Sequence, residues 1–282
     1  MDKRDSIFSG NGGDGKIDVL QACTVLYDTL PVLDAVSQQA TLERLVGPCT
    51  VEWSGVGPAG APGVSLMGGV AAFGEHRVAL VALAAPVRQE VLDVTVDVSP
   101  MPGDRRLAFA RHGAAVRVLY IGSAPDPVEQ LTALYSVASV LLGLGGLGII
   151  NERAALAQPA ELAAGLMRYL GDDAPPIQLW TGVVTFSLGE TGGISRYLLR
   201  TYGMDQLALP EVAIYIADRM QADDAYHTLM NVALYLVQNR PTVQLGVGDR
   251  VDFAGRTYLL TDPDSDASEF ASETGLLLLV EV

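Results

Sequence analysis

Apolar and polar residues follow two periodicities in the first half of the chain, and together these predict both strands and helices. Residues 30–47 place apolar side chains at helical spacing, which predicts an amphipathic helix. Residues 64–87 form two strand-like runs on either side of Gly74 and Glu75, which predicts a hairpin. Strands are also expected at residues 19–28, 49–56 and 114–122, and a helix at 103–113. Residues 89–99 alternate too weakly to assign.

A glycine-rich loop at residues 143–148 has the spacing G-x-G-x-x-G of a dinucleotide-binding loop. In such sites a strand precedes the loop and a helix follows it, and the N-terminal amides of that helix bind the pyrophosphate. Here a helix comes first, because residues 126–142 begin with Asp126 as an N-cap and Pro127 at the first helical position. Residues 147–156, after the glycines, are strand-like. The glycines therefore predict a helix C-cap and a close-packed loop, and no nucleotide cofactor is expected.

The second half of the chain begins after residues 171–176, where two acidic residues and two prolines indicate an internal boundary. The patterns beyond it predict strands at 177–188 and 275–282, a long helix at 223–240 and a hairpin that turns at 246–250. We expect an α+β fold of two mixed or antiparallel β-sheet subdomains with packed helices. The expected parts are a disordered tail at 1–18, an N-terminal subdomain at 19–172 and a C-terminal subdomain at 173–282.

Composition narrows the classes of protein that this chain can belong to. A hydrophobic fraction of 49% supplies a large core, and a formal net charge of −15 argues against nucleic-acid binding, which needs clustered Lys and Arg. The longest apolar run covers about 14 residues, whereas a membrane-spanning helix needs about 20. Because the chain also opens without an apolar leader, we expect a cytoplasmic protein that does not enter membranes. Cys23 and Cys49 are expected to be buried thiols rather than metal ligands.

Residues 262–273 resemble a calcium-binding loop in the spacing of their acidic residues. Asp262, Asp264, Asp266 and Glu273 match the oxygen ligands of an EF-hand loop. Ala267 stands where the loop needs glycine for its sharp turn, and the flanking segments are strands and not helices. We expect a solvated loop, with weak calcium binding as the alternative, and no dedicated metal site.

Common catalytic signatures are missing from the sequence, including the nucleophile elbow, the HExxH zinc motif and the phosphate-binding loop with its lysine. The three histidines, His76, His112 and His227, are isolated from one another. The candidates for a cleft between the two halves are Glu152, Arg153, Trp180, Arg200, Thr201 and Glu211. Arg–Glu pairs on neighbouring strands are more often structural than catalytic, so no catalytic residue is assigned.

A family resemblance covers about residues 20 to 282 and is most specific over 177–250. Its motifs are the strand with Trp180, the turn Thr201-x-Gly203-Met204, the sequence Leu209-Pro210-Glu211, the helix NVALYLV and the G-x-G-D of Gly246 to Asp249. These motifs resemble the bacterial DUF4261 domain, and the first half resembles the segment that precedes this domain in longer members. The resemblance implies an α+β bacterial cytoplasmic protein, and it assigns no catalytic residue because the family has no assigned function.

Few titratable groups lie near one another in the sequence in the arrangement that acid–base or nucleophilic catalysis needs. The leading hypothesis is therefore a non-enzymatic interaction module whose acidic surface meets a protein partner, either a basic protein or a second copy of itself. An immunity or inhibitor protein would be a specific form of it. The alternative is a hydrolase or small-ligand-binding enzyme that uses the cleft candidates.

Overall fold

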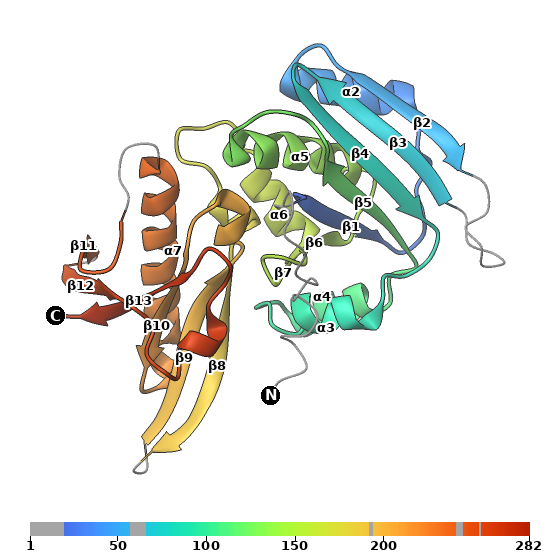
Figure 1. The fold of residues 1–282 in the computed structure, drawn as a ribbon. Coiled ribbons are helices and arrows are strands. Elements are labelled where there is room, and N and C mark those ends of the chain that lie inside the picture. The colour runs from blue at the N-terminus through green and yellow to red at the C-terminus, as the bar shows by residue number, and fades with distance from the viewer. Residues whose placement is uncertain (1–19, 57–65, 192–193, 241–244, 254) are drawn as a thin grey trace.

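The computed structural model describes residues 20–56, 66–191, 194–240, 245–253 and 255–282. Within these residues the strands form two sheets, one of seven strands and one of six. Helices pack on both sheets, so the expected α+β fold is confirmed. Figure 1 shows one sheet in each half of the molecule. The expected tail at residues 1–18 lies outside the described residues.

The first sheet is antiparallel throughout, with the strand order β2-β3-β4-β5-β1-β6-β7. Its strands are β1 (Ala22–Tyr27), β2 (Thr50–Val56), β3 (Leu66–Phe73), β4 (His76–Leu83), β5 (Ala114–Tyr120), β6 (Gly148–Asn151) and β7 (Leu156–Pro159). The predicted hairpin is confirmed, because β3 pairs with β4 and the chain turns at Gly74 and Glu75.

Helices lie on both faces of this sheet. They are α2 (Ala35–Val46), α3 (Gln89–Thr95), α4 (Gly103–Ala110), α5 (Pro127–Leu142) and α6 (Ala160–Met167). Successive strand residues point to opposite faces. Val25 accordingly joins the core beneath α2, α5 and α6, whereas Leu26 packs with Leu92 of α3 and Phe109 of α4. Residues 89–99, unassigned from the sequence, thus supply a helix to the second face.

The glycine loop after α5 has the structure that the sequence predicts. The Asp126 side chain accepts a hydrogen bond from the Val128 amide at 2.8 Å, which caps the helix start, and Gly143 is the C-cap. A Cβ atom on Gly148 would lie 2.3 Å from both the Gln158 carbonyl oxygen and Cζ of Phe109. The glycines therefore allow close packing of the chain.

The second sheet is mixed, with the strand order β11-β12-β13-β10-β9-β8 and a parallel pair formed by β10 and β13. Its strands are β8 (Gly182–Thr191), β9 (Ile194–Tyr202), β10 (Glu211–Ile216), β11 (Arg250–Phe253), β12 (Arg256–Thr261) and β13 (Leu276–Glu281). Its helical elements are α7 (Ala222–Asn239) and the short 3-10 turns η1 (Ile177–Leu179), η2 (Met204–Leu207), η3 (Arg219–Gln221) and η4 (Ser268–Phe270). The helix α7 covers one face of the sheet, and the loop with η4 packs on the other through Ala267 and Phe270.

Two local predictions in this half are wrong. The last hairpin turns between Phe253 and Arg256, which pair with each other, and not at residues 246–250. Both segments contain glycine, and the earlier one forms a separate turn in which the Gly246 amide donates to Asp249. The strand expected from residue 177 begins at Gly182, because residues 177–179 form a 3-10 turn.

One cluster of buried apolar side chains runs through both halves of the molecule. It joins Leu134 and Tyr135 of α5 to Trp180, Leu207 and Leu229 in the second half. The two sheets therefore share a core instead of having wholly separate ones. Among the described residues, no helix combines the length and apolarity needed to cross a membrane.

We predict that Gly148→Ala destabilises the protein, because the added methyl group meets Phe109 and a backbone carbonyl oxygen at 2.3 Å. Overpacking of this kind costs about 1 to 3 kcal/mol. The matched control is Gly165→Ala in α6, where the methyl group meets no atom within 4 Å. That change should leave stability unaltered or raise it by up to about 1 kcal/mol. Urea unfolding of the two variants measures both effects, and equal stabilities would contradict the packing described here.

Candidate functional site

Glu211 and Thr201, two of the residues expected in a cleft, are bonded to each other inside the protein. Oε2 of Glu211 lies 2.6 Å from the Thr201 hydroxyl, and Oε1 accepts hydrogen bonds from the Gly203 and Met204 amides at 3.0 and 3.1 Å. The Glu211 side chain is 1% exposed. It therefore fixes the start of η2 against β9 and β10, and it has no open space in front of it.

Burial raises the pKa of Glu211 to about 7, although the nearby Arg200 guanidinium and the Thr201 hydroxyl oppose part of the rise. The amide hydrogen bonds favour the ionised carboxylate, but the site is also compatible with a neutral carboxyl group. A protonated Oε2 can donate to the Thr201 hydroxyl, which in turn can donate to the Val212 carbonyl oxygen at 3.3 Å. The cluster accordingly accommodates both protonation states.

The other cleft candidates have separate structural partners. Arg153 forms an ion pair with Asp205 of η2, and Glu152 lies 3.4 Å from Arg117 on β5. Trp180 is fully buried in the shared core. The structure thus groups Arg200, Thr201 and Glu211 in one place, and it leaves Glu152 on the first sheet.

A network of amide side chains at the same junction was not found from the sequence. Nδ2 of Asn151 donates to the Tyr135 hydroxyl at 3.1 Å and to Oε1 of Gln206 at 3.3 Å. Nε2 of Gln206 donates to the Trp180 carbonyl oxygen at 3.1 Å, and the backbone carbonyl oxygen of Gln206 accepts from Nε2 of Gln21. These bonds join the two halves, so the cleft candidates surround a bonded junction.

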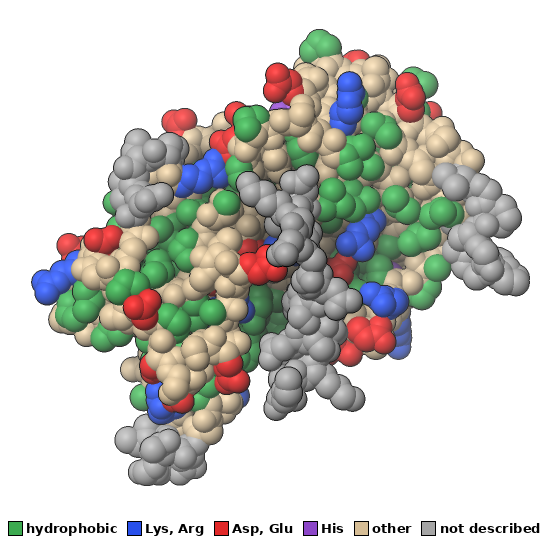
Figure 2. Space-filling view, viewed as in Figure 1, with side chains coloured by type: hydrophobic (Ala, Val, Ile, Leu, Met, Phe, Trp, Pro, Cys, Tyr) green, Lys and Arg blue, Asp and Glu red, His purple; other side chains and the backbone are tan. Residues whose placement is uncertain are grey.

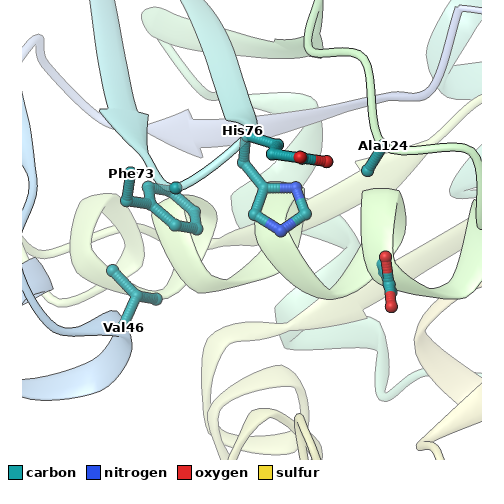
Figure 3. A pocket seen from close by; sticks show the side chains of 7 residues that line it. Val46, Phe73, His76 and Ala124 are labelled. Atoms are coloured by element: carbon teal, nitrogen blue, oxygen red, sulfur yellow. The ribbon is translucent and has the colours of Figure 1, made fainter.

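An open cavity lies elsewhere, where α2, the β3–β4 turn and the start of α5 meet. A cavity of about 350 Å³ is lined there by Val46, Phe73, Gly74, Glu75, His76, Ala124 and Glu129. Figure 3 shows the Phe73 and His76 side chains beside the same space, with Val46 and Ala124 at its borders. None of the six cleft candidates lines this cavity.

His76 is held in place by Tyr120. Its Nδ1 lies 3.1 Å from the Tyr120 hydroxyl, and that hydroxyl accepts a hydrogen bond from the Ala124 amide at 3.2 Å. In the tautomer whose Nδ1 accepts the hydroxyl proton of Tyr120, Nε2 carries the ring proton. Gly122 leaves room for this arrangement, since a Cβ atom there would lie 2.6 Å from the Tyr120 hydroxyl oxygen. That tautomer presents an imidazole N–H donor to the cavity, oriented by the Tyr120 contact.

Two carboxylates, those of Glu75 and Glu129, complete the site. Both side chains are exposed and line the cavity. They also lie close enough to Tyr120 to add to the rise that burial causes in the pKa of its hydroxyl. The site thus combines negative charge, one N–H donor and an aromatic wall formed by Phe73, whose ring centre lies 5.3 Å from that of His76.

Asp264, Asp266 and His112 each have a structural partner. In the loop of residues 262–273, Asp264 accepts hydrogen bonds from the Asp266 and Ala267 amides, and Asp266 pairs with Arg196 at 2.9 Å. Ala267 is fully buried against the sheet, whereas the acidic side chains of the loop are exposed, as expected of a solvated loop. No cluster of three metal-ligating side chains occurs in the described part of the chain. His112 is buried, and its Nε2 accepts from the Val87 amide at 2.8 Å.

Comparisons with known protein families, with curated proteins and with solved structures find no match to this chain.

We predict that Glu211→Gln changes how stability depends on pH. A pKa of about 7 in the folded state, above 4.5 in the unfolded state, means that protonated Glu211 stabilises the fold. This contribution is complete below the unfolded pKa and is lost as pH rises through about 7. Relative to the Gln variant, the wild type should therefore lose about 2 to 3 kcal/mol of unfolding free energy between roughly pH 5 and pH 8. Urea unfolding across this range tests it, and a pH-independent difference would contradict it.

Proposed function

We propose that this protein is a non-enzymatic interaction module and that the cavity lined by His76, Glu75 and Glu129 receives a basic side chain of a protein partner. The observation that carries the proposal is the combination of two exposed carboxylates with an aromatic wall in one cavity of about 350 Å³. A guanidinium or ammonium group is attracted to carboxylates and also to the face of an aromatic ring. The two glutamates offer the first interaction, and the small exposed part of the mostly buried Phe73 ring offers the second.

His76 adds a contact that a peptide would use. Its Nε2 proton is free to donate once Nδ1 accepts from the Tyr120 hydroxyl. A peptide carbonyl oxygen next to the bound basic side chain is a suitable acceptor for that proton. The cavity therefore suits a basic side chain that is part of a polypeptide better than an isolated cation.

The charge of the whole chain supports the same partner. The formal net charge is −15, and Figure 2 shows acidic side chains dispersed over the viewed face and not gathered in one patch. A dispersed negative field speeds the approach of a basic protein, whereas specificity requires a defined contact such as the cavity. An immunity or inhibitor role against a basic toxin is one form of this proposal. We also propose three properties that the sequence suggested: membership of the bacterial DUF4261 family, a cytoplasmic location and self-association.

The enzymatic alternative, a hydrolase or small-ligand-binding enzyme with a cleft between the two halves, has no specific observation in its favour. Thr201 and Glu211 bond to each other in a buried position, and Trp180 belongs to the core. These contacts support a structural role for the junction.

The test is binding of a fluorescein-labelled arginine-containing peptide, measured by anisotropy. The double variant Glu75→Gln/Glu129→Gln should weaken binding by about tenfold or more, since two charge-assisted contacts are lost. The control Glu90→Gln/Asp93→Asn removes the same charge from exposed positions of α3, which lie outside the cavity, and it should bind like the wild type. Equal weakening by both double variants would show attraction to general charge and would overturn the proposed site.

A second measurement identifies the natural partner. The tagged wild type, purified from its native host, should retain a basic protein in stoichiometric amount, and the Glu75→Gln/Glu129→Gln variant should lose it. A partner retained equally by both proteins, or no partner at all, would contradict the proposal.

A further inference from the structure

A second cavity, of about 320 Å³, lies in the other half of the molecule between α7 and the ends of β10, β12 and β13. Its apolar side is formed by Ile214, Ile216, Phe253 and Tyr258. Its polar side includes Asp224, His227 and Asn231 of α7 and, across from the helix, Arg256 and Glu281. This volume lies at the lower end of the range for small-molecule pockets, roughly 300 to 1,000 Å³. The two cavities share no lining residue.

Arg256 is the guanidinium that lines this cavity, and its side chain also has a hydrogen bond with Tyr258. It lies 3.5 Å from Glu281, and the two side chains are 53% and 57% exposed. An exposed pair of this kind contributes only about 0 to 1 kcal/mol, so Arg256 can exchange Glu281 for another carboxylate at little cost. Its planar group can then bind that carboxylate through two parallel hydrogen bonds.

Asp224 supplies the opposite charge from the helix side of the cavity. It is close enough to Arg256 to add to the rise that Glu281 causes in the pKa of that residue. Thr228, one helical turn further on, uses its hydroxyl to donate to the Asp224 carbonyl oxygen, so the Asp224 carboxylate is not engaged by it. A cation and an anion thus line one cavity from different elements, above an apolar floor.

We propose that this cavity binds a free α-amino acid with an apolar side chain. The ligand carboxylate would bind Arg256, its ammonium group would bind Asp224, and its side chain would lie on Phe253 and Ile216. A phosphate-bearing ligand fits poorly, because Asp224 and Glu281 would repel its charge. A purely apolar ligand would leave both charges without new partners.

The test is isothermal titration with L-leucine and two analogues that each lack one charge, 4-methylpentanoate and 3-methylbutylamine. L-leucine should bind, and both analogues should bind at least about tenfold more weakly, because each loses a charge-assisted contact. The other apolar amino acids, from alanine to phenylalanine, are titrated in the same way to find the preferred size. Absence of binding by every apolar amino acid at millimolar concentration would overturn the proposal, as would equal binding by the analogues.

Two pairs of variants locate the site. Arg256→Gln and Asp224→Asn should each reduce affinity for the preferred amino acid by about tenfold or more. The matched controls are Arg250→Gln on the neighbouring strand and Asp223→Asn on the same helix, which are exposed and do not line the cavity. The controls should bind like the wild type. Binding that survives Arg256→Gln, or that is lost equally in the controls, would place the ligand elsewhere. Neither result depends on the fate of the basic-partner proposal, whose variants lie in the other cavity.

Discussion

The buried amide of Gln206 is the contact on which the joining of the two halves depends. Its Oε1 accepts a hydrogen bond from Asn151 of the first sheet, and its Nε2 donates to the Trp180 carbonyl oxygen. The residue is 2% exposed. Loss of a partner for a buried polar group costs about 1 to 3 kcal/mol, so the halves resist separation at this point. The ion pairs of Arg240 with Asp126 and of Arg153 with Asp205 add further links. The two cavities described above each lie within one half and not at this junction.

The sequence predicted those helices and strands whose ends are determined by residues close together in the chain. The helix α5 is an example, since Asp126 caps it and Gly143 ends it. The helix α3 was left unassigned because its residues follow neither the helical nor the strand period clearly. Packing of Val91 and Leu92 with Ile150 and Ala157 stabilises the helix. The final hairpin was placed wrongly because two neighbouring glycine turns compete, and pairing between β11 and β12 decides between them.

The candidate sites were harder to predict because their residues are distant in the sequence. Thr201 and Glu211 lie on adjacent strands, so their proximity could be anticipated, but their complete burial could not. Asn151 and Gln206 are 55 residues apart, and His76 and Tyr120 are 44 apart. No local spacing marks either pair. Their contacts depend on the order of the strands and on the crossing of α5 over the first sheet, and these become visible only in the folded structure.

The two open cavities give each half of the molecule a distinct chemistry, negative beside Phe73 and mixed in charge beside Phe253. The three histidines of the chain provide NMR probes of the two cavities. His76 lines the first cavity, His227 lines the second, and His112 is buried away from both. The most direct test of the account is therefore the imidazole NMR spectrum during titration with an arginine-containing peptide. The account predicts that the His76 signals move while those of His112 and His227 stay in place. Unchanged His76 signals at saturating peptide would contradict it.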